Sequence, residues 1–94
     1  MDPRFEWDRR KANSNLNKHS VSFDEAQTVF MDPLFAAMPD PDHSVEEHRF
    51  IAIGVSGADR LLVISYTERE STIRIISART ATRQERRLYE YEGK

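Results

Sequence analysis

Three apolar runs separated by very short connections constrain this chain more than any other feature. They cover residues 49–55, 61–67 and 72–77 and are rich in β-branched side chains, which favour strands. Only residues 56–60 and 68–71 separate them. Because a parallel crossover needs about a dozen residues or more, the runs predict an antiparallel meander of three strands.

Two helix signals precede these strands. Asp8 can cap a helix over residues 9–19, a stretch without glycine or proline. Ser22 and Glu25 have the spacing of a capping box, and Pro33 ends the short helix that follows. In the first helix we expect an apolar stripe of Trp7, Ala12 and Leu16, and a polar face of Lys11, Asn15 and Lys18.

The chain ends with a third helix signal. Either Thr80 or Thr82 can cap this helix, and Thr82 with Glu85 repeats the spacing of a capping box. The apolar side of the helix is expected to consist of Leu88, Tyr89 and Tyr91. Shorter strands are predicted over residues 5–7 and 34–38. The element order predicts an α+β fold, in which two N-terminal helices and a C-terminal helix pack on an antiparallel sheet.

Length and composition limit the class of protein. At 94 residues the chain forms one domain, residues 1–94, too short for a doubly wound nucleotide-binding sheet. The absence of cysteine excludes disulfides, thiolate metal sites and a thiol nucleophile. No apolar run approaches the roughly 18–20 residues of a membrane span. The charged first ten residues lack the apolar stretch of a secretory signal, so we expect a cytoplasmic protein without membrane contact.

Charge is distributed unevenly, although the net charge is only −2. Residues 1–19 carry a net +2, residues 20–59 a net −7 and residues 60–94 a net +3. If the basic ends meet in the fold, they form a cationic face of the kind that binds nucleic acid. The alternative is a solvated surface with scattered ion pairs.

Charged residues also follow and interrupt the last two strands. In a hairpin that turns near Ser71, Glu68 and Arg74 come close to facing each other. Such a pair is either a weak cross-strand ion pair or part of a site. As a site, this sheet face presents guanidinium groups that bind phosphate oxygens bidentately, from Arg69 or Arg74 together with Arg79 and Arg83.

The acidic middle of the chain holds two histidines, His43 and His48. A metal site that combines them with nearby carboxylates is conceivable, but the spacing matches no tight ligand pattern. A solvated acidic loop is the simpler interpretation. The carboxylates are Asp40, Asp42, Glu46 and Glu47.

Taken in order, these segments resemble the BrnT toxin family. The resemblance begins with Phe5-x-Trp7-Asp8-x-x-Lys11-x-x-x-Asn15-x-x-Lys18-His19 and Val21-Ser22-Phe23-x-Glu25-Ala26. It continues with Arg49-Phe50-Ile51-Ala52-Ile53-Gly54, Leu62-Val63, Thr67-Glu68-Arg69, Arg74-Ile75-Ile76-Ser77-Ala78-Arg79, Arg86 and Tyr89-Glu90. The set covers nearly the whole chain. Ser20 stands where the family favours glycine, which predicts a slightly different geometry at the end of the first helix.

The resemblance implies a RelE-like fold and a ribonuclease toxin that blocks translation, as one half of a bacterial type II toxin–antitoxin pair. It also implies a tightly bound antitoxin, BrnA, whose ribbon-helix-helix domain binds DNA. Through this antitoxin the pair represses its own promoter. The substrate is then RNA, either free or on the ribosome, and no cofactor is expected.

A ribonuclease that works without a metal ion needs groups that transfer protons and cations that stabilise the phosphorane. Histidine suits proton transfer near neutral pH, and a carboxylate can act as the base. The expected catalytic residues are His19, Glu68, Arg69 and Arg79. The expected RNA- or phosphate-binding residues are Lys11, Lys18, Arg74 and Arg83. The alternative is a non-catalytic module that binds nucleic acid or protein with the same face. The tyrosines that could stack on a base, or instead pack in the fold, are Tyr66, Tyr89 and Tyr91.

Overall fold

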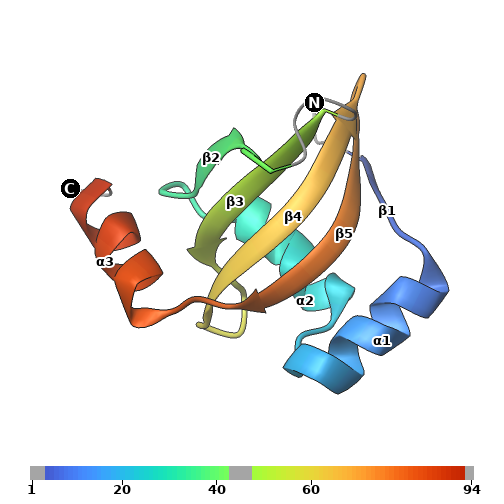
Figure 1. The fold of residues 1–94 in the computed structure, drawn as a ribbon, viewed down its shortest axis with the longest axis horizontal. Helices are drawn as coiled ribbons and strands as arrows, with labels where there is room; N and C mark the ends of the chain where they lie inside the picture. Colours follow the sequence, from blue (N-terminus) through green and yellow to red (C-terminus); the bar gives the residue numbers. More distant parts are fainter. Residues whose placement is uncertain (1–3, 43–47, 93–94) are drawn as a thin grey trace.

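The computed structural model describes residues 4–42 and 48–92, which form one five-stranded sheet flanked by helices (Figure 1). The strands are β1 (Arg4–Glu6), β2 (Ala36–Pro39), β3 (Arg49–Val55), β4 (Leu61–Arg69) and β5 (Thr72–Thr80). The helices are α1 (Arg9–His19), α2 (Phe23–Gln27), the short 3-10 helix η1 (Thr28–Met31) and α3 (Arg83–Glu92). The α+β class predicted from the sequence is confirmed. Within the described ranges, no helix has the length and apolar character needed to cross a membrane.

The strand order is β1-β5-β4-β3-β2. The strands from β2 to β5 pair antiparallel with their neighbours, so the predicted meander is confirmed. Strand β1 runs parallel to β5, and the prediction of a purely antiparallel sheet is therefore wrong at this edge. The rule for short connections does not apply there, because these two strands come from opposite ends of the chain.

Helices α2 and η1 cover one face of the sheet, behind it in the view of Figure 1, and form the main core. The largest fully buried side chains of this core are Phe23, Leu62, Ile64, Ile75, Val21 and Val29. Burying one such side chain stabilises the fold by about 1.5–3 kcal/mol. Because side chains alternate along a strand, the remaining strand residues point to the opposite face.

A buried amide joins α1 to the sheet. Asn15 Nδ2 donates to the carbonyl oxygens of Val21 (2.9 Å) and Ala78 (2.7 Å), and Asn15 Oδ1 accepts from the N–H of Ala78 (3.0 Å). The predicted polar face, which placed Asn15 with Lys11, is therefore wrong. Leu16 of the predicted apolar stripe is 48% exposed. The amide is favoured at the buried position because it pairs with backbone groups that a leucine would leave unsatisfied.

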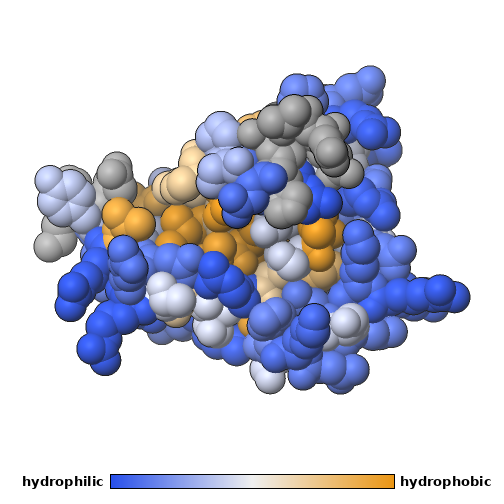
Figure 2. All heavy atoms as spheres, viewed as in Figure 1, coloured by the Kyte–Doolittle hydropathy of each residue, from blue (hydrophilic) through white to orange (hydrophobic). Residues whose placement is uncertain are grey.

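Among the hydrophobic residues of helix α3, Tyr89 packs on the opposite face of the sheet. This face carries a smaller apolar cluster of Ile53, Leu61 and Val63, and Tyr89 packs against it. The Tyr89 hydroxyl also donates to Asp32 (2.6 Å). Leu88 and Tyr91, predicted to share this packing, are 56% and 81% exposed. Since α3 projects to the side of the sheet, hydrophobic atoms stay visible between the two (Figures 1 and 2).

The predicted helix starts are confirmed. Asp8 accepts hydrogen bonds from the first turn of α1, and Ser22 accepts one from that of α2. Thr82 and Glu85 form the full capping box of α3, since each side chain accepts from the other residue's N–H. At the end of α1, Ser20 takes the left-handed conformation (φ 58°, ψ 32°) that glycine adopts without strain. The backbone at this position thus has the shape that the expected glycine would favour.

Candidate active site

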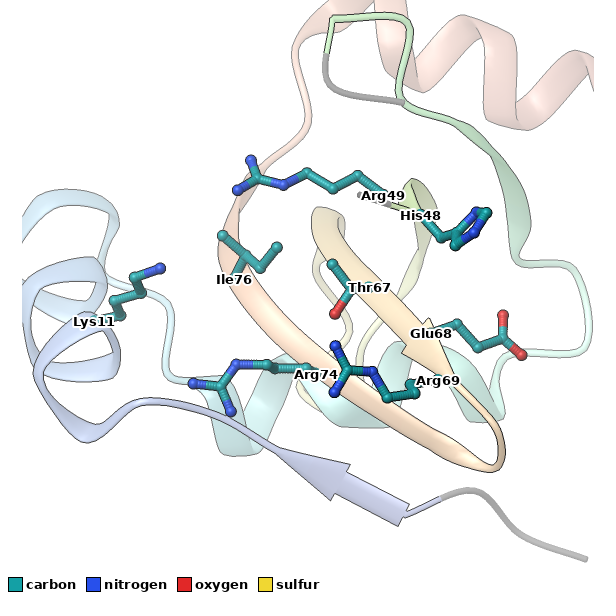
Figure 3. Close-up of a pocket in the computed structure, with 8 residues that line it drawn as sticks. All are labelled: Lys11, His48, Arg49, Thr67, Glu68, Arg69, Arg74 and Ile76. Carbon is teal, nitrogen blue, oxygen red and sulfur yellow. The ribbon is translucent and has the colours of Figure 1, made fainter. Parts of the chain in front are cut away.

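A hollow of about 380 Å³ opens at the end of the sheet where β3 begins, β4 ends and β5 begins (Figure 3). Four of its side chains are cations, one is a carboxylate and one is an imidazole. The lining residues are Lys11, His48, Arg49, Thr67, Glu68, Arg69, Arg74 and Ile76. The hollow therefore joins residues from the basic first helix, the start of the meander and its last hairpin.

Strand register places the centre of this set. Thr67 pairs with Arg49 on one side and with Arg74 on the other, so the three side chains share one face of the sheet. A β-bulge opposite Ser65 and Tyr66 leaves Ile76 without a partner on β4. Ile76 is thereby added to the wall of the hollow. Lys11 reaches the site from α1, which packs beside β5.

The hairpin between β4 and β5 differs from the predicted one by its turn. Arg69 pairs directly with Thr72, so Glu68 lies opposite Ile73 and Thr67 lies opposite Arg74. The predicted facing of Glu68 and Arg74 is therefore wrong. The reason is that the turn needs only two residues, with Glu70 in the left-handed conformation at φ 56°.

Arg74 pairs with a residue of the first strand instead. Its Nη1 lies 2.7 Å from Glu6 Oε2, and both side chains are about half exposed. An exposed pair of this kind contributes about 0–1 kcal/mol, so Arg74 can exchange this partner for a phosphate at small cost. A second hollow of similar size continues past Arg69 and Arg74 toward Glu70. A nucleic-acid strand thus has room on both sides of the two arginines.

Tyr66 lies in the core on the other face of β4. Its ring packs against Phe30 and Phe50, with centroid distances of 5.0 and 5.6 Å. Burial, reinforced by the negative charge of Glu68, raises the pKa of Tyr66 to about 12. Tyr66 is therefore a packing residue, as is Tyr89, and neither presents its ring to a base.

Four of the eight predicted site residues line the hollow: Lys11, Glu68, Arg69 and Arg74. The other four, which the structure does not place there, are His19, Lys18, Arg79 and Arg83. His19 ends α1 while Lys11 lies near its start, about 12 Å away along the axis. Arg79 stands about 15 Å from Arg74 along β5. Their roles stay predictions.

Arg79 is held by a carboxylate at the start of α3. Its Nη1 and Nη2 donate to Glu85 Oε1 and Oε2 at 2.7 and 2.8 Å. The Arg79 guanidinium, helped by the N–H of Thr82, lowers the pKa of Glu85 to about 2 against the opposing effect of burial. Arg83 is exposed on α3 itself. In this structure, the bidentate geometry expected for phosphate serves a protein carboxylate.

Four lining residues were not predicted from the sequence as site residues: the apolar Ile76 and the polar His48, Arg49 and Thr67. The signal was present in the short turn of residues 56–60, because an antiparallel hairpin sets the start of its first strand beside the end of its second. Counting outward from that turn brings Arg49 to Thr67 and His48 to Glu68. The acidic surroundings of His48 instead drew attention to metal ligation.

The metal alternative finds no support in the described ranges. Across residues 4–42 and 48–92, no group of three or more histidine, aspartate or glutamate side chains is placed to hold a metal ion. His43, Glu46 and Glu47 lie outside these ranges. Asp40 is buried, and its carboxylate accepts from the N–H of Asp42 (3.0 Å).

The chemistry available to the hollow follows from its side chains. Arginine and lysine remain charged at neutral pH and bind phosphate oxygens. A carboxylate accepts protons, and an imidazole exchanges them near neutrality. The lining of the hollow therefore includes residues that can bind a phosphodiester and residues that can exchange protons.

Comparison with known proteins identifies related sequences and folds. The family described as "Ribonuclease toxin, BrnT, of type II toxin-antitoxin system" matches residues 7–85. Among solved structures, the crystal structure of the Brucella abortus ribonuclease toxin BrnT is similar with a TM-score of 0.67. Sequence identity is 20%, and the likeness covers 86% of this chain and 99% of that chain. At this identity the likeness shows a shared fold. No curated protein matches the chain.

Proposed function

The chain belongs to the BrnT family of ribonuclease toxins of type II toxin–antitoxin systems, and we propose that it is a RelE-like endoribonuclease that cleaves RNA without a metal ion. Cleavage takes place in the cytoplasm and inhibits translation. A BrnA-type ribbon-helix-helix antitoxin binds the toxin tightly, neutralises it and links the pair to promoter DNA. The observation that carries the proposal is the hollow, whose lining includes four cationic residues and one carboxylate.

The reaction we propose begins at the 2′-hydroxyl of the nucleotide on the 5′ side of the scissile bond. The 2′-oxygen attacks phosphorus and gives its proton to a base. The bond from phosphorus to the 5′-oxygen breaks, and that oxygen takes a proton from an acid. The products are a 2′,3′-cyclic phosphate and a free 5′-hydroxyl, so no water and no metal ion enter the step.

Fixed cations contribute the larger part of such catalysis. The phosphorane carries more negative charge than the phosphodiester, so donors aimed at its oxygens stabilise it more than the ground state. Arg69 and Arg74 line both hollows, and Lys11 lines the first of them. Within the described ranges, neither Lys11 nor Arg69 has an ion pair that would compete with the substrate.

We place the proton transfer in the hollow, with Glu68 as the base. Glu68 is exposed and lies on the strand that also carries Arg69. His19 and Arg79 are not included in the reacting set, because neither lines the hollow. Lys18 and Arg83 are exposed on other elements and are proposed to contact RNA only beyond the scissile phosphate.

The test is cleavage by the purified protein of an end-labelled RNA, alone and as messenger on translating ribosomes, in the presence of EDTA. We expect new ends that carry 2′,3′-cyclic phosphate and 5′-hydroxyl groups. The same strand made of DNA should remain intact, since it lacks the attacking hydroxyl. Arg69→Gln should slow cleavage by about 10²–10³-fold. Arg87→Gln, which removes an exposed arginine of α3, is the matched control.

Three results would contradict the proposal. If EDTA abolishes cleavage, the reaction needs a metal ion. If the DNA strand is cut as fast as the RNA, the 2′-hydroxyl is not the nucleophile. If RNA binds at the hollow and is never cut, free or on ribosomes, the chain is a non-catalytic binding module.

A further inference from the structure

The large apolar side chains that are exposed on the described residues gather mostly in two segments. Six of seven lie either at residues 31–38 or in α3, and their exposed fractions run from 37% to 81%. The six, which we call the α3–β2 surface, are Met31, Leu34, Phe35, Met38, Leu88 and Tyr91. The seventh is Leu16 of α1. Exposed apolar side chains that are grouped in this way are typical of protein–protein contact sites.

The two segments are held next to each other by Tyr89. Its hydroxyl donates to Asp32 (2.6 Å), and its ring packs with Ala36 and Ile51 on the smaller apolar cluster. Met38 pairs with Ile51 in the strand register, so its side chain lies on this same face of the sheet. Strand β2 and α3 lie on the same side of the sheet in Figure 1, and Figure 2 shows hydrophobic atoms between α3 and the sheet. The exposed apolar side chains therefore belong to one region of the molecule.

The apolar side chains of α3 border arginines. Arg83 and Arg87 precede Tyr91 by two turns and by one turn of the helix, so the three residues form one row along it. Within the described ranges, neither arginine has an ion pair. At the opposite border, Asp42 follows β2 and carries the opposite charge. The surface is therefore complementary to an apolar segment that carries carboxylates toward α3 and none toward the end of β2.

We propose that the α3–β2 surface is the docking site of the antitoxin, through an amphipathic segment whose carboxylates face the arginines of α3. This inference rests on the function proposed above and gives its protein partner a place on the fold. The matched family consists of toxins of type II toxin-antitoxin systems, so a partner is expected for this chain. The match ends at residue 85 and thus assigns no role to Leu88 or Tyr91.

The position of the surface suits a partner that neutralises the toxin. Met38 pairs with Ile51, and Ile51 is two residues from Arg49, about 7 Å away along β3. Arg49 lines the hollow. A segment that covers Met38 therefore stands beside the hollow and hinders the approach of an RNA strand. Because the surface and the hollow consist of different residues, their partners can be tested separately.

The first experiment measures by calorimetry the affinity of the purified antitoxin, encoded with this chain, for the wild type and for Leu88→Asp. A carboxylate in the middle of the apolar contact should weaken binding about 10–100-fold. Leu16→Asp is the matched control, because Leu16 is 48% exposed and Leu88 is 56% exposed, and Leu16 lies outside the surface. Its affinity should equal that of the wild type. Melting temperatures report whether each variant is folded, and Tyr91→Ser, at a side chain that is 81% exposed, is the second test of the surface.

A second pair of variants tests the charge of the docked segment. Gln84 lies on the same side of α3 as Leu88 and Tyr91, at spacings of four and seven residues. Gln84→Glu should weaken the binding of the antitoxin and Gln84→Lys should strengthen it, each by about three- to tenfold at low salt. The difference between the two variants should shrink as salt is added. Equal effects of the two substitutions would show that the docked segment is not acidic.

The outcomes distinguish this inference from the proposed ribonuclease activity, because the titration uses no RNA. If the wild type binds the antitoxin with these losses and yet cuts no RNA, the docking site stands and the ribonuclease activity is overturned. If the wild type binds no antitoxin, or if Leu88→Asp and Tyr91→Ser bind it as tightly as the wild type does, the docking site is overturned. If these variants instead lose only self-association in sedimentation, or only affinity for a 2′-O-methyl RNA strand, the surface binds a second copy or RNA and the inference is wrong.

Discussion

Two ends of the same sheet carry arginines, and they use them differently. At the hollow, and among the described residues, Arg69 has no ion pair and Arg74 pairs with the exposed Glu6. At the other end, both terminal nitrogens of Arg79 bind Glu85. The sequence presents these arginines as one basic group. The carboxylates that the fold places beside them decide which guanidinium groups remain available to a ligand.

The end of the sheet at Arg79 also attaches helix α3, whereas among the described residues the end at the hollow holds no such helix contact through its arginines. Glu85 accepts from Arg79 and from the N–H of Thr82, so it joins the end of β5 to the start of α3. Tyr89 supplies the other attachment of this helix through Asp32. Substitutions should therefore affect chemistry at the hollow and stability at α3.

The largest effect is expected at Arg69. Arg69→Gln should reduce the rate of RNA cleavage by about 10²–10³-fold, because it removes a fixed cation from the developing phosphorane. Its free energy of unfolding should stay within about 0.5 kcal/mol of the wild type, as is usual for an exposed side chain. Rate assays and urea titrations measure the two quantities. If Arg69→Gln lost stability in proportion to its loss of rate, the two ends of the sheet would not differ in the way proposed.

Arg79→Gln should affect stability more than the rate of cleavage. It leaves the partly buried Glu85 carboxylate without its ion-pair partner, which should destabilise the fold by about 2 kcal/mol. For a domain of this size, that corresponds to a fall in Tm of roughly 8–16 °C. We expect a smaller loss of cleavage than for Arg69→Gln. If Arg79→Gln abolishes cleavage at an unchanged Tm, the contrast is wrong and Arg79 belongs to the site.

The pH dependence of stability should carry the signature of Glu85. Its pKa in the folded protein, about 2, lies below its ordinary value of 4.5 because Arg79 favours the ionised form. A depressed carboxyl pKa stabilises the fold above pH 4.5, and this stabilisation disappears as pH falls from 4.5 toward 2. After allowance for partial exposure we expect about 1–2 kcal/mol. The difference in Tm between the wild type and Glu85→Gln, followed from pH 7 to pH 2, should shrink in that window. A constant difference would show that the pair does not hold the helix.

The smallest effect is expected at the other attachment of α3. Tyr89→Phe keeps the ring on the apolar cluster and removes only the hydrogen bond to Asp32. The fold should lose about 1 kcal/mol. Hydrogen exchange of the α3 amides should accelerate, while exchange in β4 should not. Equal acceleration in both would mean that α3 and the sheet open as one unit.

Local signals account for the parts of the fold that the sequence predicted. Residues 49–55 and 61–67 form strands because β-branched side chains and short turns leave few alternatives. The capping pairs around Ser22 and Thr82 mark helix starts because they satisfy backbone groups within one turn. Distant contacts account for the errors. The pairing of β1 with β5, and the burial of Asn15 beside Ala78, join segments that no local pattern connects.

The residues of the candidate site also fall into those that local spacing predicts and those that depend on distant contacts. Glu68, Arg69 and Arg74 could be found because they sit at the last hairpin, where spacing alone brings residues together. His48 could have been found by counting register from the turn of residues 56–60. Arg79 could not be separated from Arg74 by pattern, because the distinction depends on the position of Glu85. A charged residue can be assigned to a binding site only when the fold shows which protein groups pair with it.

The most direct test of the account is to map where RNA binds. Backbone amide shifts of the protein should be followed by NMR as a 2′-O-methyl RNA strand, which cannot be cleaved by the proposed route, is added. We predict shifts concentrated at Lys11, residues 67–69 and Arg74, with little change from Arg79 through α3. Shifts concentrated at Arg79 and α3, with the hollow unaffected, would contradict the central claim that the hollow is the ribonuclease site.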